Sequence, residues 1–476
     1  MQYSIVDKSR LERTLRLDSE YFLPYYLELE RTLLKKIDTL SKITDVCKVS
    51  DGNHFAVAES FTKTNGIPYY RGQDLADFFM ENITPVFIPD EYYNKSWMKR
   101  SHFNLNDILL SIVGTVGSVS LITDRILQST GSCKIAILRP KNINSYYLGL
   151  FLSGKFGKYQ INKNVRGAVQ TGLILEDMDQ IMIYNASINF QNLIEYVGKR
   201  ALLFSRQTTE MSNQAQSILL SELGLENWKP EHKLSFIENY SDVKEAERFD
   251  ADYFQPKYEE INCILAKHSP VMLLENLCSQ INYGTVPTSP YQPQGIPYIK
   301  GLNLVDGFIE GDIDKLMNCD GLQSKFYVKE NDIVISQMGT VGKAGIIEKE
   351  HVGCLFASFT IRIRLKNKEF IDPYVLTLYI NEIARPYYLL RRIAQASVRQ
   401  NTDLPTIRNM PIPTIKMDIQ ENIRSNIKQS KDCKQKSKAL LEIAKRGVEM
   451  AIEQDEDIAE KWIKEECGKL GVEINA

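Results

Sequence analysis

The chain carries two copies of one domain-sized unit. The segment Arg16–Tyr26 reads RLDSEYFLPYY and returns as RFDADYFQPKY at Arg248–Tyr258, an offset of 232 in the numbering. The segment GIPYYRGQDL that begins at Gly66 returns as GIPYIKGLNL at Gly295, an offset of 229. A nearly constant offset indicates one long duplication, whose period is far too long for a solenoid of short stacked repeats. Two similar modules predict two related but non-identical binding surfaces.

Composition limits the classes of protein to which this chain can belong. Its 476 residues carry a formal net charge of −2, and its 8 cysteines are scattered. The length predicts two to four domains. The near-neutral charge argues against a freestanding, strongly basic DNA binder, but it leaves room for a basic face or for charge supplied by partner subunits. The sequence has no metal-ligand spacing. It has neither an apolar run of membrane-spanning length nor an apolar signal core, and this predicts a cytoplasmic protein.

Each copy has the same predicted order of elements. A short helical lead-in precedes a strand-rich body, in which β-branched and aromatic runs are broken by Gly, Pro, Asn and Asp. We name Leu40–Ile183 the first body and Leu273–Ile412 the second body. The lead-in helices are predicted at Ser19–Ile37 and Ala251–Lys267, and a helix-like stretch within each body is predicted at Tyr146–Asn162 and Pro373–Ala394.

A long helix is predicted after each body, at Phe190–Gly224 and at Asp418–Ile452. In the first helix, a mostly apolar stripe advances by alternating steps of four and three, which is the 3.5-residue period of a coiled-coil seam. Its positions are Phe190, Ile194, Val197, Ala201, Phe204, Thr208, Met211, Ala215 and Ile218. The corresponding positions of the second helix are more polar: Ile419, Ile423, Asn426, Ser430, Cys433, Ser437, Leu440, Ala444 and Gly447. We expect the two helices to pack antiparallel. A helix of about 35 residues, roughly 50 Å long, is commensurate with the spacing of two DNA half-sites.

Together, the duplicated G-I-P-Y-x-[RK]-G, the duplicated G-T-V-G after an apolar strand and the long helix after each body resemble the specificity (S) subunit of type I restriction–modification systems. The resemblance runs from about Arg16 to about Ile452. It implies an α+β fold with two tandem target recognition domains and an antiparallel coiled coil. The implied divisions are target recognition domain 1 at 1–187, the first spacer helix at 188–226, a linker with target recognition domain 2 at 227–416, and the second spacer helix with an acidic tail at 417–476.

The resemblance also implies a function. Specificity subunits have no catalytic centre; they read a bipartite DNA target and lend that specificity to two docked copies of a modification methyltransferase and to a restriction translocase. This chain is therefore expected to bind double-stranded DNA and no membrane. It is expected to hold no cofactor itself, since S-adenosylmethionine, ATP and Mg belong to the partner subunits. The alternative left open is the specificity subunit of a type IIB-like or other phage-defence complex.

One stretch departs from a plain duplicate. Glu226–Ala246 is interpreted as an addition between the first long helix and the second module. The acidic tail after Ile452 is interpreted as its partial counterpart.

The G-T-V-G loops that begin at Gly114 and Gly339 are the first candidate DNA contacts. Such a loop exposes backbone N–H groups that can cradle a phosphate oxygen with the help of the threonine hydroxyl. The alternative is a plain hairpin turn, for which glycine is the default residue. The candidate residues are Thr115 and Ser118 in the first body and Thr340 and Lys343 in the second. A lysine beside the second loop favours a phosphate contact there.

The G-I-P-Y-x-[RK]-G motif supplies Tyr69 and Arg71 in the first body and Tyr298 and Lys300 in the second. Strand alternation places each tyrosine on the same face as its basic residue. Arginine can pair bidentately with guanine, and lysine can contact guanine or phosphate. Because the two bodies should read different bases, the shared residues are better interpreted as backbone anchors or structural elements than as base readers.

Base readers are expected where the copies diverge. The sequence DGNH, which ends in Asn53 and His54, is replaced in the second copy by NYGT, which ends in Thr285. A second divergent set consists of Arg166 and Gln170 in the first body and of Arg399 and Gln400 in the second. Asn and Gln suit adenine edges and Arg suits guanine, so differing sets predict an asymmetric target. The alternative is that these are polar surface loops without a role in DNA binding.

Catalytic motifs are missing from the sequence. The amino-methyltransferase motif N-P-P-[YF] or D-P-P-[YF] is absent, since Asp372-Pro373-Tyr374 lacks the second proline, and there is no G-x-x-x-x-G-K-[ST] loop. A self-sufficient nuclease or methyltransferase is thereby disfavoured. A pure coiled-coil scaffold is disfavoured by the divergent polar loops on otherwise duplicated modules.

Overall fold

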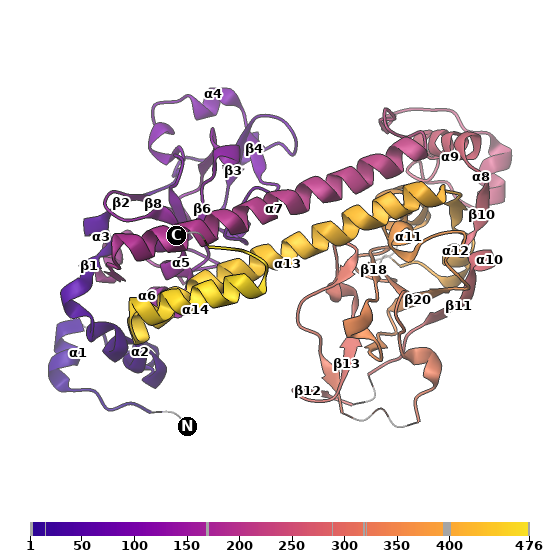
Figure 1. Cartoon of the computed structure of the whole chain (residues 1–476). Helices are drawn as coiled ribbons and strands as arrows, with labels where there is room; N and C mark the ends of the chain where they lie inside the picture. Colours follow the sequence, from indigo (N-terminus) through magenta and orange to yellow (C-terminus); the bar gives the residue numbers. More distant parts are fainter. Residues whose placement is uncertain are drawn as a thin grey trace. The chain divides into compact units, whose positions relative to one another are not determined.

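A computed structural model of the chain describes residues 3–14, 16–167, 171–287, 289–317, 319, 321–393 and 401–474 (Figure 1). The chain divides into two compact units. Unit 1 comprises Met1–Thr209 with Asp432–Ala476, and unit 2 comprises Glu210–Lys431. Each unit therefore contains one body and a part of each long helix.

A four-stranded antiparallel sheet forms the centre of the first body. Its strands lie in the order β2 (Cys47–Asp51), β8 (Ile135–Pro140), β5 (Ile108–Ser111) and β6 (Val119–Leu121). Strand β5 is buried along its whole length, which is why its sequence ILLS is apolar without alternation. A second sheet contains β4 (Val86–Ile88), β3 (Ile67–Tyr70) and β7 (Thr130–Gly131). Strands β1 (Leu40–Lys42) and β9 (Met182–Tyr184) pair the two ends of the body.

The second body repeats this plan. Its main sheet has the order β11 (Cys278–Tyr283), β20 (Thr360–Leu365), β17 (Ile333–Ser336) and β18 (Ala344–Ile346). The second sheet contains β12 (Tyr291–Gln292), β16 (Lys315–Leu316), β13 (Ile296–Ile299) and β19 (Leu355–Phe356). Two further pairs are β10 (Val271–Leu273) with β21 (Pro411–Pro413) and β14 (Leu304–Val305) with β15 (Phe308–Ile309). Even the register repeats: Ile108 faces Leu138 in the first body, and Ile333 faces Ile363 in the second.

The helix-like stretch predicted within each body is interrupted. In the first body, Gly154 separates α5 (Ser145–Ser153) from α6 (Lys155–Lys163). In the second, α11 (Pro373–Tyr379) continues as a π-helix, Ile380–Leu389, that contains Pro386. A proline inside a helix has no N–H to donate and its ring collides with the preceding turn, which accounts for the widened turns. Asn144 and Asp372 cap α5 and α11 by accepting hydrogen bonds from backbone N–H groups.

The lead-in helices are shorter than the sequence predicted. Helix α2 spans Pro24–Leu34 and α9 spans Lys257–His268. Each starts at or directly after a proline, a residue that suits the first helical turn because its missing N–H would be unpaired there anyway. The shorter helices of the bodies are α3 (Ile43–Val46), α4 (Asp90–Tyr93), α10 (Leu274–Leu277) and α12 (Leu404–Arg408).

The two long helices are confirmed. Helix α7 spans Ile188–Glu222 and α13 spans Met417–Glu453, and the predicted seam positions of both are buried or half-buried. Within unit 1 the Ser437 hydroxyl donates to the carbonyl oxygen of Ala201 at 2.8 Å, while Cys433 lies against Gln207. The helices are therefore antiparallel, as expected from the repeat. The Ser437 contact also explains one polar seam position, because its hydroxyl bonds the facing backbone.

The acidic tail is part of the core of unit 1. Asp455 caps a further helix, α14 (Glu456–Lys469), by accepting a hydrogen bond from the N–H of Ile458 at 2.8 Å. The helix folds back along α13 (Figure 1) and buries Ala459, Ile463 and Cys467 in the same apolar cluster as α7.

The interpretation of Glu226–Ala246 as an addition was wrong for its second half. Helix α8 (Tyr240–Ala246) stands before the second copy where α1 (Lys8–Thr14) stands before the first, and the two helices have the same length. After each helix an arginine pairs with an aspartate at 2.6 Å and lies over a tyrosine ring: Arg16 with Asp18 and Tyr21, and Arg248 with Asp250 and Tyr253. The duplication therefore begins before Arg16. The counterpart of α8 is this N-terminal segment and not the acidic tail.

Candidate nucleic-acid interface

In the first body, a charged cluster stands where β2 ends. Asp51 is the last residue of β2, and its carboxylate accepts a hydrogen bond from Nη2 of Arg100 at 2.5 Å and contacts the His54 ring. The Arg100 side chain is 57% exposed and Nη2 also reaches the carbonyl oxygen of Gly52. One carboxylate therefore holds two side chains with hydrogen-bond donors at the surface. A guanidinium held in this way is suited to a guanine edge or a phosphate.

An aromatic pair lies close by in sequence and structure. The ring of Phe55 is half-exposed and its centroid is 4.5 Å from that of Trp97. Lys99 and Arg100 follow this tryptophan closely in the sequence. Cations next to exposed aromatic rings are typical of surfaces that bind nucleic acids.

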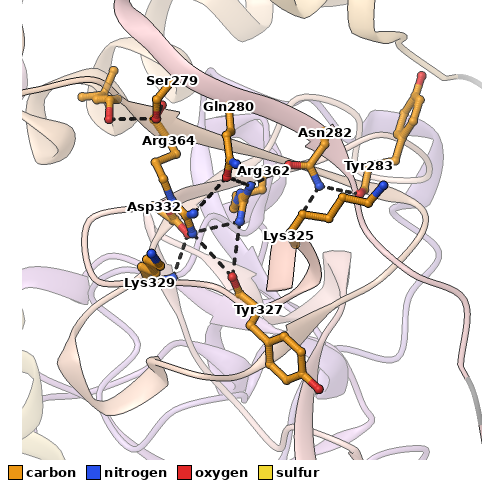
Figure 2. A network of polar contacts seen from close by, with 11 residues as sticks. Ser279, Gln280, Asn282, Tyr283, Lys325, Tyr327, Lys329, Asp332, Arg362 and Arg364 are labelled. Atoms are coloured by element: carbon orange, nitrogen blue, oxygen red, sulfur yellow. Dashed lines mark hydrogen bonds and ion pairs between the residues drawn. The ribbon is translucent and has the colours of Figure 1, made fainter. Parts of the chain in front are cut away.

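In the second body, the equivalent place is a network of amides and arginines (Figure 2). Gln280 and Asn282, both on β11, turn their carbonyl oxygens toward Nη2 of Arg362, each at 2.6 Å. Arg364 donates to the same Gln280 oxygen at 2.9 Å and pairs bidentately with Asp332 at 2.6 Å. The side chains are held firmly, because charge-assisted hydrogen bonds join the arginines to the amides and to a buried carboxylate.

One ion pair recurs in both bodies, whereas a position beside it carries different residues in the two. Asp107 pairs with Arg139 at 3.2 Å in the first body, and Asp332 pairs with Arg364 in the second. Both aspartates are buried, and burial raises the pKa of Asp107. Residue 137 lies opposite Leu109 in the register of the first body, and Arg362 lies opposite Val334 at the same place in the second. A buried isoleucine in one copy is thus a buried arginine in the other.

The shared tyrosines of the G-I-P-Y motifs point into the bodies. Tyr69 and Tyr298 are buried. The Asn53 amide donates to the Tyr69 hydroxyl at 3.4 Å and to the carbonyl oxygen of Phe55 at 2.9 Å. In the second body the Tyr298 hydroxyl donates to the carbonyl oxygen of Thr285 at 2.7 Å, and Thr285 is also buried. A base contact by any of these four side chains would require it to leave its present partners, whereas His54 is already exposed.

The basic residues of the same motifs have intramolecular partners. Arg71 pairs bidentately with Asp74 at 3.0 and 3.1 Å. Lys300 contacts Asp314 and lies 4.7 Å from the centroid of the Tyr291 ring. These contacts support the structural part of the sequence interpretation, in which the motif anchors the short turn that follows β3 and β13.

The G-T-V-G loops are tight turns between β5 and β6 and between β17 and β18. All four glycines have positive φ, between 74° and 91°, which only glycine adopts without strain. The N–H groups of Gly117 and Gly342 close the turns on the carbonyl oxygens of Ser111 and Ser336, both at 2.9 Å. The Thr115 hydroxyl donates to the carbonyl oxygen of Gly72. A phosphate contact stays a prediction; Thr115, Thr340 and Lys343 are exposed and Ser118 is half-exposed.

The other divergent set is only partly described. Arg166 is exposed and donates to Asp177 at 2.7 Å, while its backbone pairs with Gly172. Gln170, Arg399 and Gln400 lie outside the residues that the structure describes.

Sequence reasoning did not select Arg100, Gln280 or Arg362. A strand-by-strand alignment of the copies at an offset of 225 sets Arg362 against Ile137, and this contrast of charge with apolarity was the available signal. Arg100 has no such signal, because its contact with Asp51 joins residues 49 positions apart.

Neither a metal-ligand cluster nor a membrane-spanning helix is found in the described part of the chain. Among the described residues, no group of three or more His, Cys, Asp or Glu side chains is arranged to hold a metal ion. Within the same residues, every helix is too short or too polar to cross a membrane.

Two strand-rich bodies whose main sheets have the same strand order, each followed by a long helix, define a duplicated α+β protein. A family model described as "Type I restriction modification DNA specificity domain" matches residues 39–194 and again 276–442, which is more than half of the chain. The chain belongs to this family, the specificity subunits that recognise DNA targets in type I restriction–modification systems. Members of the family are generally non-catalytic.

Solved structures of related type I proteins are similar to this chain over most of its length. The S subunit from M. genitalium is 12% identical with a TM-score of 0.45, over 89% of this chain and 95% of that one. The HsdS subunit from Thermoanaerobacter tengcongensis is 13% identical with a TM-score of 0.29, over 87% and 96%. A chain from a study of complex assembly and conformational transition of the type I R-M system is 13% identical with a TM-score of 0.29, over 90% and 96%. Curated protein sequences gave no match.

Proposed function

We propose that this chain reads a bipartite, asymmetric DNA target, with one half-site for each body. Within this proposal the target recognition domains are 1–187 and 227–416, the latter including its linker. The first spacer helix lies at 188–226, and 417–476 holds the second spacer helix with the acidic tail. The chain works in the cytoplasm as a non-catalytic subunit, and S-adenosylmethionine, ATP and Mg are used by its partners.

One observation carries the proposal: the bodies share a buried ion pair but carry different polar residues toward the ends of β2 and β11. The buried Asp107–Arg139 pair recurs as Asp332–Arg364, so the scaffold is duplicated. At the ends of β2 and β11, however, the first body has a charged cluster around Asp51 and the second has an amide and arginine network around Asn282. A duplicated scaffold with unlike polar surfaces is what two different half-sites require, because base edges are read by the pattern of donors and acceptors.

The helices supply the second part of the proposal, which is docking of two methyltransferase subunits. Outside its seam, α13 carries a charged face in unit 1. A hollow of about 310 Å³ lies between this face and the start of α6, and it is lined by Ser153, Gly154, Lys155, Lys158, Glu442, Lys445, Arg446 and Glu449. A hollow of mixed charge beside a helix is suited to a polar rim contact with a partner subunit. The restriction translocase joins the same complex in the proposed assembly.

The experiment is methylation of a DNA library, with both half-sites randomised, by the complex of this chain and its methyltransferase. Arg100→Ala should relax the first half-site at one position and leave the second unchanged. Arg125→Ala is the matched control, because Arg125 is equally exposed (56%) and also pairs with a carboxylate, that of Glu81, on the same body. Equal effects of the two substitutions would refute the assignment of Arg100.

Exchange of the whole first body tests the modular interpretation itself. Replacement of Leu40–Ile183 by the body of a relative should change one half-site only. A change in both half-sites would contradict it. A complex that cuts or modifies without a separate methyltransferase would favour the alternative, a type IIB-like system.

A further inference from the structure

The second body contains a buried arginine that its core does not need. The Arg362 side chain is 0% exposed, and burial lowers its pKa to about 10. Its Nε has no hydrogen-bond partner among the described residues. The first body fills the equivalent position with Ile137, which is fully buried in an apolar cluster. Removing a guanidinium from water is costly, and an apolar residue of similar volume is often as stable or more stable. The fold of a body therefore does not require a cation at this position.

The charges around Arg362 do not explain it either. Asp332 is the buried carboxylate next to it, and Arg364 already pairs with both of its oxygens. Arg362 stands 3.9 Å from Asp332, so it adds a second cation to a carboxylate that has one. Among the described residues of the first body, Asp107 pairs with a single cation, Arg139. Beside this carboxylate the second body thus carries a second buried cation, where the first body has Ile137.

The short contacts of Arg362 run to the two amides on β11. Its Nη2 donates to Gln280 Oε1 and to Asn282 Oδ1, both at 2.6 Å (Figure 2). A guanidinium has donors only, so the amide atom that faces it must be the oxygen. The direction of both amides is therefore set by chemistry. The amino group of Asn282 then donates to the carbonyl oxygens of Tyr283 and Lys325.

Gln280 is different, because its amino group remains open. Its Oε1 accepts from both arginines, and its Nε2 has no partner among the described residues. The residue is exposed on β11. Two guanidinium groups, those of Arg362 and Arg364, contact its Oε1 and share the carboxylate of Asp332, which leaves an excess of positive charge (Figure 2). Such an excess attracts a phosphate backbone.

We propose that Arg362 is a positioning residue that locks Gln280 with its amino group outward, so that Gln280 reads an acceptor-bearing base edge in the major groove of the second half-site. This inference rests on the proposed function. A glutamine free to use both amide groups can pair bidentately with adenine, but a glutamine whose oxygen is occupied can only donate. Guanine offers major-groove acceptors at O6 and N7, adenine at N7 and thymine at O4, whereas cytosine presents its N4 amino group. One position of the second half-site should therefore reject cytosine.

The test uses the assembled methyltransferase complex and a DNA library with both half-sites randomised. Arg362→Ile, which restores the residue type of the first body, should lower the preference against cytosine at one position by about tenfold. The first half-site should not change. The urea midpoint of the chain should stay the same or rise, a readout that separates positioning from a structural role.

Two further variants sharpen the test. Gln280→Glu keeps an oxygen for both arginines but turns an acceptor outward, so the preference at that position should move toward cytosine. Ser279→Ala is the matched control, since the Ser279 hydroxyl bonds the carbonyl oxygens of Arg364 and Leu365 across the strand pair. It should leave both half-sites unchanged.

The outcomes are distinguishable. If the unchanged complex modifies no bipartite motif, the proposed function fails. If it does so and Arg362→Ile keeps the full preference at every position of the second half-site, only the role of Arg362 is overturned. Equal loss at both half-sites would also overturn it, because that would indicate a defect in assembly.

Discussion

Helix α14 lies so close to α13 that a single methyl group should disturb it. A Cβ atom at Gly447 would stand 2.4 Å from Cδ1 and 2.7 Å from Cγ1 of Ile463, which is fully buried. Real carbon atoms do not approach this closely, so Ile463 must shift in a filled core, at a cost of about 1–3 kcal/mol. Alanine in place of glycine within a helix stabilises the folded state by about 0.5–1 kcal/mol. Taking the two effects together, we expect Gly447→Ala to lower the free energy of unfolding by about 1 kcal/mol.

Gly468 is the matched control, because it lies in α14 and a Cβ there would meet no atom within 4 Å. Gly468→Ala should therefore stabilise the chain by about 0.5 kcal/mol through helix propensity alone. Urea unfolding of the full chain, followed by circular dichroism, measures both. Ile463→Val removes the Cδ1 atom that the new methyl group would meet first, so Gly447→Ala combined with Ile463→Val should cost less than the two single changes added together. Stabilisation by Gly447→Ala, or strict additivity in the pair, would refute the close packing of α14 on α13.

Three other outcomes are expected. Arg139→Met leaves the buried Asp107 carboxylate without its cation and should lower the free energy of unfolding by about 3 kcal/mol. Arg364→Met should cost less, because Arg362 remains 3.9 Å from Asp332. Equal urea midpoints for the two variants would contradict this. Burial lowers the pKa of His102, whose ring stacks on Tyr93. The contribution of His102 to stability should therefore be constant above about pH 6.5 and fall below it, where only the unfolded chain takes the proton. His102→Phe should flatten that fall, and an unchanged pH profile of unfolding would exclude His102 as its source. Ser437→Ala removes the hydrogen bond to Ala201 across the helix pair and should cost about 1 kcal/mol, while Ser425→Ala on the exposed face of α13 should be neutral or slightly stabilising in the same unfolding assay.

The large features of the fold follow from sequence because they are periodic or repeated. The seam from Phe190 to Ile218 predicts a helix without any knowledge of its neighbours, and the second helix inherits its place from the duplication. Strand pairing does not follow in this way. Strand β2 lies beside β8, which is far away in the sequence, and no local pattern encodes that choice. The copy of α1 was missed because few side chains in it are identical, although the Arg–Asp pair after each helix is kept.

The candidate interface was predicted in part for a similar reason. Residue type and divergence drew attention to the end of β2, where Asp51 and His54 do lie in a charged surface cluster. Residue type does not show which way a side chain points, so the sequence predicts Asn53 and Thr285 as base readers although both are buried. The burial of Arg362 could not be predicted, because an arginine in a strand is normally exposed. Only the strand register shows that its side chain faces the interior.

The division of the chain into units has a consequence for biosynthesis. Unit 2 is one uninterrupted stretch, Glu210–Lys431, so all of its core residues leave the ribosome in succession and can condense while translation continues. Unit 1 is different, because Leu440, Ala444 and Ile463 belong to the same apolar cluster as Phe190 and Ile194. Its core stays open until residues 432–476 have been made, after the whole of unit 2. The half of the protein that is synthesised first is therefore the half that finishes folding last, and a nascent chain arrested near residue 431 would present an exposed apolar face to chaperones.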